Sequence, residues 1–437
     1  MFVFNRGDLP PDPSFPADLK QLGYFINDQD QIRKISDPKQ EFQFKINKND
    51  RWNETQREAM NACIREIVSQ RLRASGLVTL RLPLSSISTQ PHVPILVSPN
   101  ISTASRIIVV FGENVQDLGI WAYRKVSSDG IATGSAVSFA RAVLGLESNI
   151  EDAASAAKQI RTHKTALVLT NPGQLIWHCG SSQAMSLQSW LAFPRSSAVD
   201  PPDTMSDRNK IPGNDTWQEH IYHVFERILN PNGRFVRKDA KIDIIGLADG
   251  GLGAIRYLAD EWDYWRGSIS AICLSHPLHH AQFELGQPGA ESPPSDSFPS
   301  FVSSRCRAYV LSDKPVGLPV PGSDEHVCNC YSSGEDLNVE CIMPAAWKKM
   351  LEWLTRMYEN PELCEEQLKF RNGEGQKVQN GEGQKLNNGV GQKIQNGEGQ
   401  KLENGMGQKL ENGAEQKLKN GVGKKLDNGV EHKLKSV

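Results

Sequence analysis

The sequence contains no long hydrophobic run and little cysteine. No apolar stretch approaches the roughly 18 residues that a membrane-spanning helix needs. Met1–Pro16 lacks the apolar core of a secretory signal peptide. Eight cysteines scattered over 437 residues are too few for a disulfide scaffold. These absences predict an intracellular, soluble protein with reduced thiols and no membrane association.

The sequence also lacks an excess of charge of either sign. It has 49 basic and 51 acidic residues, a formal net charge of −2. Because nucleic-acid binding demands clustered Lys and Arg, direct binding to nucleic acid is not expected. Apolar residues make up 38 %, below the roughly 45–50 % of an average domain. Part of the chain is therefore expected to contribute nothing to a core.

That part is an eight-residue repeat, present in eight copies over residues 372–435. Each copy, such as NGEGQKVQ at Asn372, has an Asn-Gly turn signal and one aliphatic residue. One aliphatic residue per copy cannot offset the ordering entropy of a Gly-rich backbone, so the sequence predicts a linker and a disordered tail over 359–437. A solenoid with one turn per repeat is the alternative. The 12 basic and 8 acidic residues from Arg371 onward are too balanced for a nucleic-acid-binding arm.

Residues 15–358 are predicted to form one domain, preceded by an extended, Pro-rich segment over 1–14. Apolar β-branched runs alternate with helical patterns, which favours a mostly parallel sheet with helices on both faces, a three-layer α/β sandwich. The predicted strands are Leu77–Leu84, Val93–Val97, Arg106–Phe111, Ala166–Leu169, Lys241–Ile245, Ile269–Leu274, Ala308–Leu311 and Val327–Tyr331. The predicted helices are Glu54–Leu72, Ala136–Leu144, Asn214–Ile228 (capped by Asp215), Gly253–Trp262 and Pro344–Tyr358.

The junction after the strand at Lys241 has the pattern of a nucleophile elbow. In that motif a strained strand-to-helix turn requires small residues two positions before and two positions after the nucleophile. Gly246, Gly250 and Gly251 occupy those positions if residue 248 is the nucleophile. Residue 248 is Ala, which has no heteroatom and cannot attack a substrate. The sequence therefore predicts a degenerate elbow with no catalytic residue.

Three other interpretations of this junction remain open. In a shifted register Asp249 is the nucleophile, although Leu247 would then occupy a position that needs a small residue. A dinucleotide-binding loop is disfavoured, because the sequence is not G-x-G-x-x-G and no acidic residue ends the next strand. A plain strand-to-helix turn without chemistry is the simplest interpretation.

The remaining parts of a catalytic triad are incomplete as well. The acid and the His follow the nucleophile in chain order in hydrolases of this kind, and Asp313 is a candidate acid. The loop Ser332–Asn338, where the His belongs, contains none. A hydrolase with an unconventional nucleophile (Asp249, Ser275 or Ser333) is the alternative function. Other histidines come before the last predicted strand, too early for the catalytic His: His276, His279, His280 and His326. The segment that would form an oxyanion loop is Gly112-Glu113-Asn114, which follows the strand at Arg106.

Two further groups of residues deserve a structural explanation. His326, Cys328 and Cys330 resemble a metal site, but a structural zinc needs four ligands and no second pair is near. We therefore expect no metal and no cofactor, and buried thiols instead. The second group could form a binding surface, but simpler explanations exist. His220 and His223 are explained as imidazoles that are solvated or lie at the edge of the core. The others are explained as side chains that cover the core: Trp177, His178, Trp190 and Arg195.

Several motifs together resemble the fungal Argonaute-binding (Arb) domain family, which is named for a subunit of an Argonaute siRNA chaperone complex. They occur in order over about residues 15–358: LPPDPSFPADLKQLGYFINDQDQIRKI, VVFGENVQDLGIWAYR, LTNPGQLIWHCG, IPGNDTWQEHI, KIDIIGLADGG and YSSGEDLNVECIMPAAW. Similar domains occur at the C-terminus of fungal class II histone deacetylases.

The resemblance implies an α/β-hydrolase-like fold and a role in RNA silencing and heterochromatin assembly in the nucleus. It implies protein partners: Argonaute, and an Arb-type subunit or a histone deacetylase. Some members of the family keep Ser at the elbow, where this chain has Ala248. The expected function is accordingly that of a non-catalytic interaction module, a pseudoenzyme.

Overall fold

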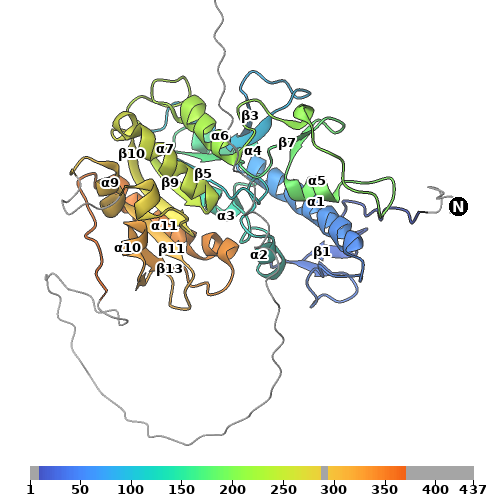
Figure 1. Ribbon diagram of the computed structural model, residues 1–437. Coiled ribbons are helices and arrows are strands. Elements are labelled where there is room, and N and C mark those ends of the chain that lie inside the picture. Colours follow the sequence, from blue (N-terminus) through green and yellow to red (C-terminus); the bar gives the residue numbers. More distant parts are fainter. Residues whose placement is uncertain (1–8, 287–293, 371–437) are drawn as a thin grey trace, which may run out of the picture. The chain divides into compact units, whose positions relative to one another are not determined.

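The computed structural model describes residues 9–286 and 294–370 (Figure 1). The predicted disordered tail and its repeats at 372–435 lie outside these residues. All described residues belong to one compact unit. In the described part of the chain, no helix is both long and apolar enough to cross a bilayer.

Thirteen strands are found among the described residues, nine of them in one sheet. The order of that sheet is β12-β13-β11-β10-β9-β5-β6-β4-β3. The six strands from β13 to β6 run parallel, while β12, β4 and their neighbours pair antiparallel. The strands of this sheet are β3 (Val78–Leu82), β4 (Val93–Val97), β5 (Arg106–Phe111), β6 (Thr165–Leu169), β9 (Lys241–Leu247), β10 (Ile269–Ser275), β11 (Cys306–Val310), β12 (Pro319–Val320) and β13 (Asn329–Ser332).

Two hairpins and a set of helices complete the fold. The hairpins pair β1 (Tyr24–Ile26) with β2 (Ile32–Lys34), and β7 (Ile176–His178) with β8 (Gln183–Met185). The α-helices are α1 (Asp50–Ala74), α2 (Tyr123–Ser128), α3 (Val137–Val143), α4 (Ala153–Ile160), α5 (Leu187–Ala192), α6 (Trp217–Val224), α7 (Asp249–Trp265), α8 (Ala281–Glu284), α9 (Phe298–Arg305), α10 (Ser323–His326) and α11 (Ile342–Glu359). Short 3-10 turns lie at Asp207–Asn209 and Val339–Cys341.

Strand β5 explains the three-layer arrangement. All six of its residues are buried, because helices cover both faces of the sheet. Ile107, Val109 and Phe111 face the core formed with α6, α7 and α9. Ile108 and Val110 face the second core, formed with α1, α3, α4 and α11. The prediction of an α/β fold with a mostly parallel sheet is confirmed.

The predicted helix over 214–228 differs in the structure. Helix α6 begins after Thr216, whose hydroxyl accepts a hydrogen bond from the Glu219 N–H, so the prediction of Asp215 as the cap is wrong. The Asp215 N–H instead donates to the Glu219 carboxylate. After Val224 the chain continues as a π-helix over Phe225–Leu229, where aromatic rings of the core stack on Phe225.

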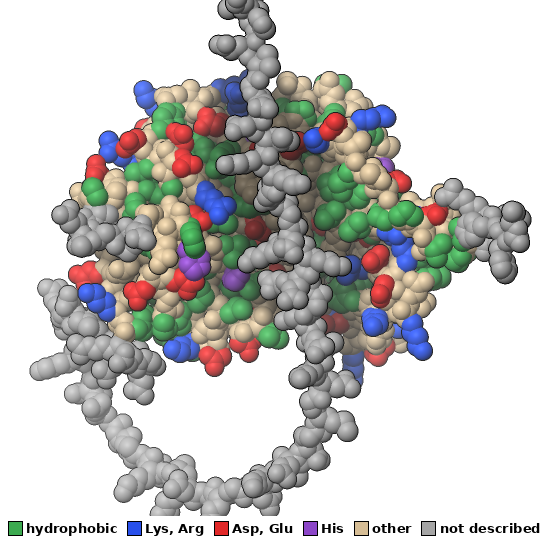
Figure 2. All heavy atoms as spheres, in the orientation of Figure 1, with side chains coloured by type: hydrophobic (Ala, Val, Ile, Leu, Met, Phe, Trp, Pro, Cys, Tyr) green, Lys and Arg blue, Asp and Glu red, His purple; other side chains and the backbone are tan. Residues whose placement is uncertain are grey.

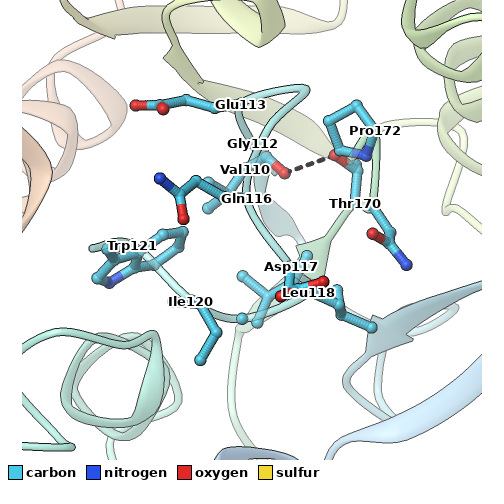
Figure 3. Close-up of a pocket in the computed structure, with 13 residues that line it drawn as sticks. Val110, Gly112, Glu113, Gln116, Asp117, Leu118, Ile120, Trp121, Thr170 and Pro172 are labelled. Carbon is cyan, nitrogen blue, oxygen red and sulfur yellow. Dashed lines mark hydrogen bonds between the residues drawn. The ribbon is translucent and has the colours of Figure 1, made fainter. Parts of the chain in front are cut away.

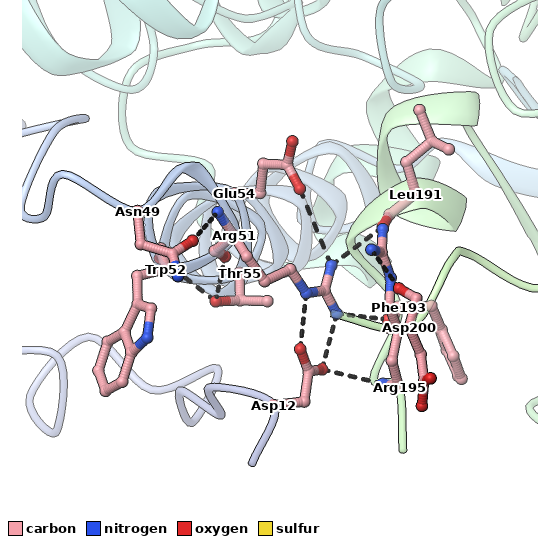
Figure 4. A network of polar contacts seen from close by, with 10 residues as sticks. All are labelled: Asp12, Asn49, Arg51, Trp52, Glu54, Thr55, Leu191, Phe193, Arg195 and Asp200. Carbon is pink, nitrogen blue, oxygen red and sulfur yellow. Dashed lines mark hydrogen bonds and ion pairs between the residues drawn. The ribbon is translucent and has the colours of Figure 1, made fainter. Parts of the chain in front are cut away.

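Ion pairs hold the segments before the first helix and after the last helix against the domain. Asp12 and Arg51 form a pair with side chains 7 % and 5 % exposed, and Arg51 also donates to the Leu191 and Phe193 carbonyls (Figure 4). The described part of the extended segment predicted over 1–14 is thus anchored at Asp12 to α1 and, through Arg51, to the end of α5. At the other end, Glu365 pairs with Arg307 of β11. The linker predicted from residue 359 therefore begins with a packed segment.

Candidate functional site

The turn between β9 and α7 has the backbone geometry of an elbow. Ala248 has φ 43° and ψ −113°, a left-handed conformation that side chains other than Gly rarely adopt. Strand β9 is the middle strand of the nine, so the turn lies at the centre of the carboxyl edge of the parallel strands. The Ala248 N–H donates to the Ser275 carbonyl at 2.9 Å, which connects the turn to the neighbouring strand β10.

Close backbone contacts explain the glycines around Ala248. A Cβ on Gly250 would lie 2.3 Å from the Gly112 carbonyl oxygen. A Cβ on Gly246 would lie 2.3 Å from the Cα of Gly251. Both contacts are with backbone atoms that have no freedom to move aside. Residue 248 is therefore the apex of the turn, and the apex carries only a methyl group.

Asp249, the nucleophile of the alternative register, begins helix α7 instead of occupying the apex. Burial raises the pKa of its carboxyl, while backbone N–H groups of Asp249 itself and of Asn114 stabilise the ionised form and oppose that shift. These two N–H groups follow the apex and the strand β5, where the donors of an oxyanion hole belong. The side chain of Asp249 thus lies near donors that a hydrolase would offer to its substrate.

His276 lies closer to Asp249 than its place in the sequence indicated. It follows β10 directly, at φ 53°, and its N–H donates to the Tyr309 carbonyl. Burial lowers the pKa of His276, and His326 lowers it further, whereas the charge of Asp249 raises it. A neutral imidazole and a carboxylate therefore neighbour each other beside an apex that has no nucleophile.

Glu113 is the third ionisable group at this edge. It extends from the loop after β5, away from Thr170 and Pro172, and its residue is 8 % exposed (Figure 3). Burial raises the pKa of its carboxyl to about 7, and the charges of Glu340 and Asp249 add to the effect. The cavity beside this loop measures about 20 Å³, room for little more than one water molecule. The loop therefore encloses no substrate pocket of its own.

The other candidates for a triad do not join this group. Asp313 is exposed, and within the described residues no hydrogen bond or ion pair of its carboxylate is found. Ser333 is fully buried, and its hydroxyl donates to the Val310 carbonyl at 2.8 Å. Ser275 is 2 % exposed. None of the three presents a group to a substrate at the apex.

The metal-like histidine and thiols lie in the core of the sheet's far end. The His326 and His279 rings each bond to the backbone carbonyl of the other residue at 2.9 Å, so both are held by structure. Burial lowers the pKa of His279 to about 4. Cys328 and Cys330 are buried. Over residues 9–286 and 294–370 no group of three or more such side chains has a metal-binding arrangement.

The remaining histidine and tryptophan candidates have structural partners. His220 is fully buried between the Asn171 N–H and the Asn214 side chain, and burial lowers its pKa to about 3. Trp190 donates to the Asp203 carbonyl at 3.0 Å. The other members are likewise engaged: His223 with the Gly213 carbonyl, Trp177 in the core, His178 with Ser181, and Arg195 with the Leu191 carbonyl.

Sequence reasoning missed Glu340, which stands in the 3-10 turn before α11 and influences Glu113. A further candidate is a pocket of about 490 Å³ beside Asn114, formed with α1 and α5. Its exposed apolar residues are Val115, Leu187 and Leu191. No pattern in the sequence pointed to either feature, because each depends on segments far apart in the chain.

These features define an α/β-hydrolase-like fold with an elbow that has no nucleophile at its apex. The family model of the Arb2 domain matches residues 15–316, and the chain belongs to that family. Among solved structures, a histone deacetylase from Saccharomyces cerevisiae is similar at a TM-score of 0.35 and 13 % identity, over 68 % of this chain and 98 % of that one. Among curated proteins, none matches this sequence.

Proposed function

We propose that this chain is a non-catalytic interaction module, an Arb2 domain that binds protein partners and carries out no hydrolysis. The observation that carries the proposal is Ala248 at the strained apex of the elbow. The strain is retained while the hydroxyl that would use it is missing. The backbone N–H groups of Asn114 and Asp249, which favour the ionised form of the Asp249 carboxyl and oppose the rise in its pKa, support the same conclusion.

By the family resemblance, the partners are Argonaute and an Arb-type subunit or a histone deacetylase, in silencing complexes of the nucleus. Binding through nucleic acid is disfavoured, because residues 1–370 hold 37 basic and 43 acidic residues. On the face in Figure 2, basic and acidic side chains are interspersed and form no field of one sign. Tagged full-length chain, purified from nuclear extract, should retain Argonaute or a deacetylase after nuclease treatment.

An aspartate-dependent hydrolase is the second candidate, favoured by one observation: Asp249 and His276 are neighbours at the carboxyl edge of the sheet. Against it, Asp249 begins a helix instead of occupying the apex of the turn. Ester turnover that disappears in Asp249→Asn, with the fold intact, would establish this candidate in place of the first.

The decisive test is to replace the missing hydroxyl. Full-length wild type and Ala248→Ser are assayed with p-nitrophenyl esters and with a fluorophosphonate probe. We expect both proteins to be inactive and unlabelled, because the loop Ser332–Asn338 supplies no His. Turnover by the wild type, above that of heat-denatured protein, would refute the non-catalytic role.

A further inference from the structure

The strand β3 forms one end of the nine-stranded sheet and leaves an open edge. Among the described residues it pairs with β4 alone, in the register Thr79 opposite Leu96 and Arg81 opposite Pro94. In an antiparallel pair, every second residue turns its N–H and C=O away from the partner strand. The hydrogen bonds on the other side of β4 identify the residues of β3 whose backbone groups face outward.

The backbone groups of Pro94 in β4 and of Ser98 just after it form hydrogen bonds on the side away from β3. The Pro94 carbonyl accepts from the Asn171 side chain at 3.0 Å, and the Ser98 N–H donates to the Leu167 carbonyl at 2.9 Å. The even-numbered residues of β4 therefore direct their backbone groups toward β6. Their partners on β3, Thr79 and Arg81, consequently direct theirs outward.

The outward groups of Thr79 and Arg81 are available. In the part of the chain that the structure describes, no hydrogen bond to these N–H or C=O groups is found, and both residues are exposed. An exposed strand edge of this kind is a template for one more strand. A partner segment in extended conformation would form the tenth strand of the sheet here.

A groove of about 350 Å³ runs beside this edge, between the sheet and α1. Thr79, Pro94 and Leu96 form its floor, since their side chains share one face of the sheet. Arg73 in the last turn of α1 lines its wall. An added strand would turn every second side chain toward this face and the others toward Val78, which is 46 % exposed.

The charges beside the edge select the partner. Among the described residues, Arg73 and Arg81 have no ion pair, whereas Arg65 in the groove is already held by Glu58 and Asp117. The acidic lining residue Glu66 accepts from the neutral Gln70 amide at 2.8 Å and has no ion pair among the described residues, so the two unpaired arginines outnumber it. Two copies of β3 joined edge to edge would bring the unpaired arginines together, which disfavours a second copy of this chain.

We propose that β3 is the docking edge for an extended segment of a partner protein, acidic at alternate positions. The partner's backbone pairs with Thr79 and Arg81, its acidic side chains face Arg73 and Arg81, and its apolar side chains lie beside Val78. This inference rests on the proposed function, because it names a surface that such an interaction module uses.

The probe is an acetylated, amidated octapeptide of alternating valine and glutamate, titrated by calorimetry into the full-length chain. We expect binding that weakens at least tenfold in Thr79→Pro, which removes an outward donor, and in the double variant Arg73→Glu, Arg81→Glu. Arg57→Glu, on the same helix but outside this groove, is the matched control and should bind as the wild type does. Hydrogen exchange should slow at the Thr79 and Arg81 amides when the peptide is present.

Three results would overturn the proposal: no binding by the wild type, equal binding of a valine–lysine peptide, or no change in exchange at Thr79 and Arg81. A dimer in sedimentation that Thr79→Pro dissolves would also overturn it, because a second copy would then occupy the edge. If Argonaute or a deacetylase co-purifies equally with Thr79→Pro, the docking edge is wrong while the interaction role stands. Ester turnover by the wild type would instead refute the interaction role itself.

Discussion

The elbow after β9 and the edge strand β3 belong to one sheet but use their backbone donors in opposite ways. At the elbow, the N–H groups of Asn114 and Asp249 favour the ionised form of a carboxyl of the chain itself, that of Asp249. At β3, the groups of Thr79 and Arg81 turn outward, with no partner in the described residues. Donors that are satisfied internally stabilise a turn, whereas unpaired donors at an edge are available to another molecule. The donors at the centre of the sheet thus act on a group of the chain itself, whereas those at its edge face outward.

The largest effect is expected from adding one methyl group at the elbow. In Gly250→Ala the new Cβ would lie 2.3 Å and 2.4 Å from the backbone oxygens of Gly112 and Phe111. Since neither strand β5 nor helix α7 can shift freely in a packed core, we expect a loss of at least about 3 kcal/mol in the free energy of unfolding. Urea denaturation followed by circular dichroism measures it. Gly267→Ala, where a Cβ meets no atom within 4 Å, is the control; an equal loss in both would show that the elbow is not tightly packed.

The second effect is a pH-dependent gain of stability in Glu113→Gln. Because the folded chain keeps the proton of Glu113 up to a pKa of about 7, against 4.5 when unfolded, it binds more protons than the unfolded chain in between. This group's contribution to stability is therefore complete below pH 4.5 and is lost as the pH rises through 7. Glu113→Gln should be more stable than the wild type by up to ~3 kcal/mol above pH 7 and equal to it near pH 4.

Urea titrations at several pH values measure that difference. The control is Glu151→Gln, since Glu151 is exposed and outside the elbow. A Glu113→Gln variant whose stability differs from the wild type by the same amount at pH 4 and pH 8 would contradict the burial of this carboxyl.

Much of the central sheet could be predicted from local patterns. The bounds of β4 and β5 agree with the predicted strands Val93–Val97 and Arg106–Phe111, because a continuous apolar run between polar or Gly-containing turns specifies a buried strand. The position of the elbow followed in the same way from three glycines between a strand and a helix. Both signals are contained within a dozen residues of sequence.

The rest depends on segments that only the fold brings together. The hairpin of β7 and β8 and helix α5 span three to six residues each, too short for a periodicity to emerge. The neighbours of Asp249 are Glu113 and Asn114 from the loop after β5 and His276 from the loop after β10, two connections far apart in the sequence. The burial of Asp12 likewise depends on Arg51, 39 residues away. No spacing along the chain reports such a contact.

A smaller effect is expected from removing the charge at the start of α7. In Asp249→Ala the helix loses an acidic group that interacts favourably with its N-terminus, but the fold also loses a carboxyl whose ionised form burial disfavours, so the net change in the free energy of unfolding should stay within about 1 kcal/mol. The nearby carboxyl of Glu113 loses a repelling charge, so its pKa should fall from about 7 toward its ordinary value. The pH at which stability declines, measured by the same urea titrations, should shift to lower pH. An unchanged midpoint would mean that the carboxylates of Asp249 and Glu113 do not interact.

The smallest effect tests which residues of the edge strand β3 have outward-facing N–H groups. Thr79→Pro removes a donor that faces outward, and proline is tolerated at such positions of an edge strand, so its stability should stay within about 1 kcal/mol of the wild type. Leu80→Pro, one residue on, removes a donor that faces Ile95 in the ladder and should cost about 3 kcal/mol or more. Both variants are compared by urea denaturation at pH 7. The two variants remove N–H groups from opposite sides of β3, and Leu80→Pro also removes a partly buried side chain that packs against the core. The reverse order of stabilities would therefore place the open donors on Leu80 and close the edge at Thr79.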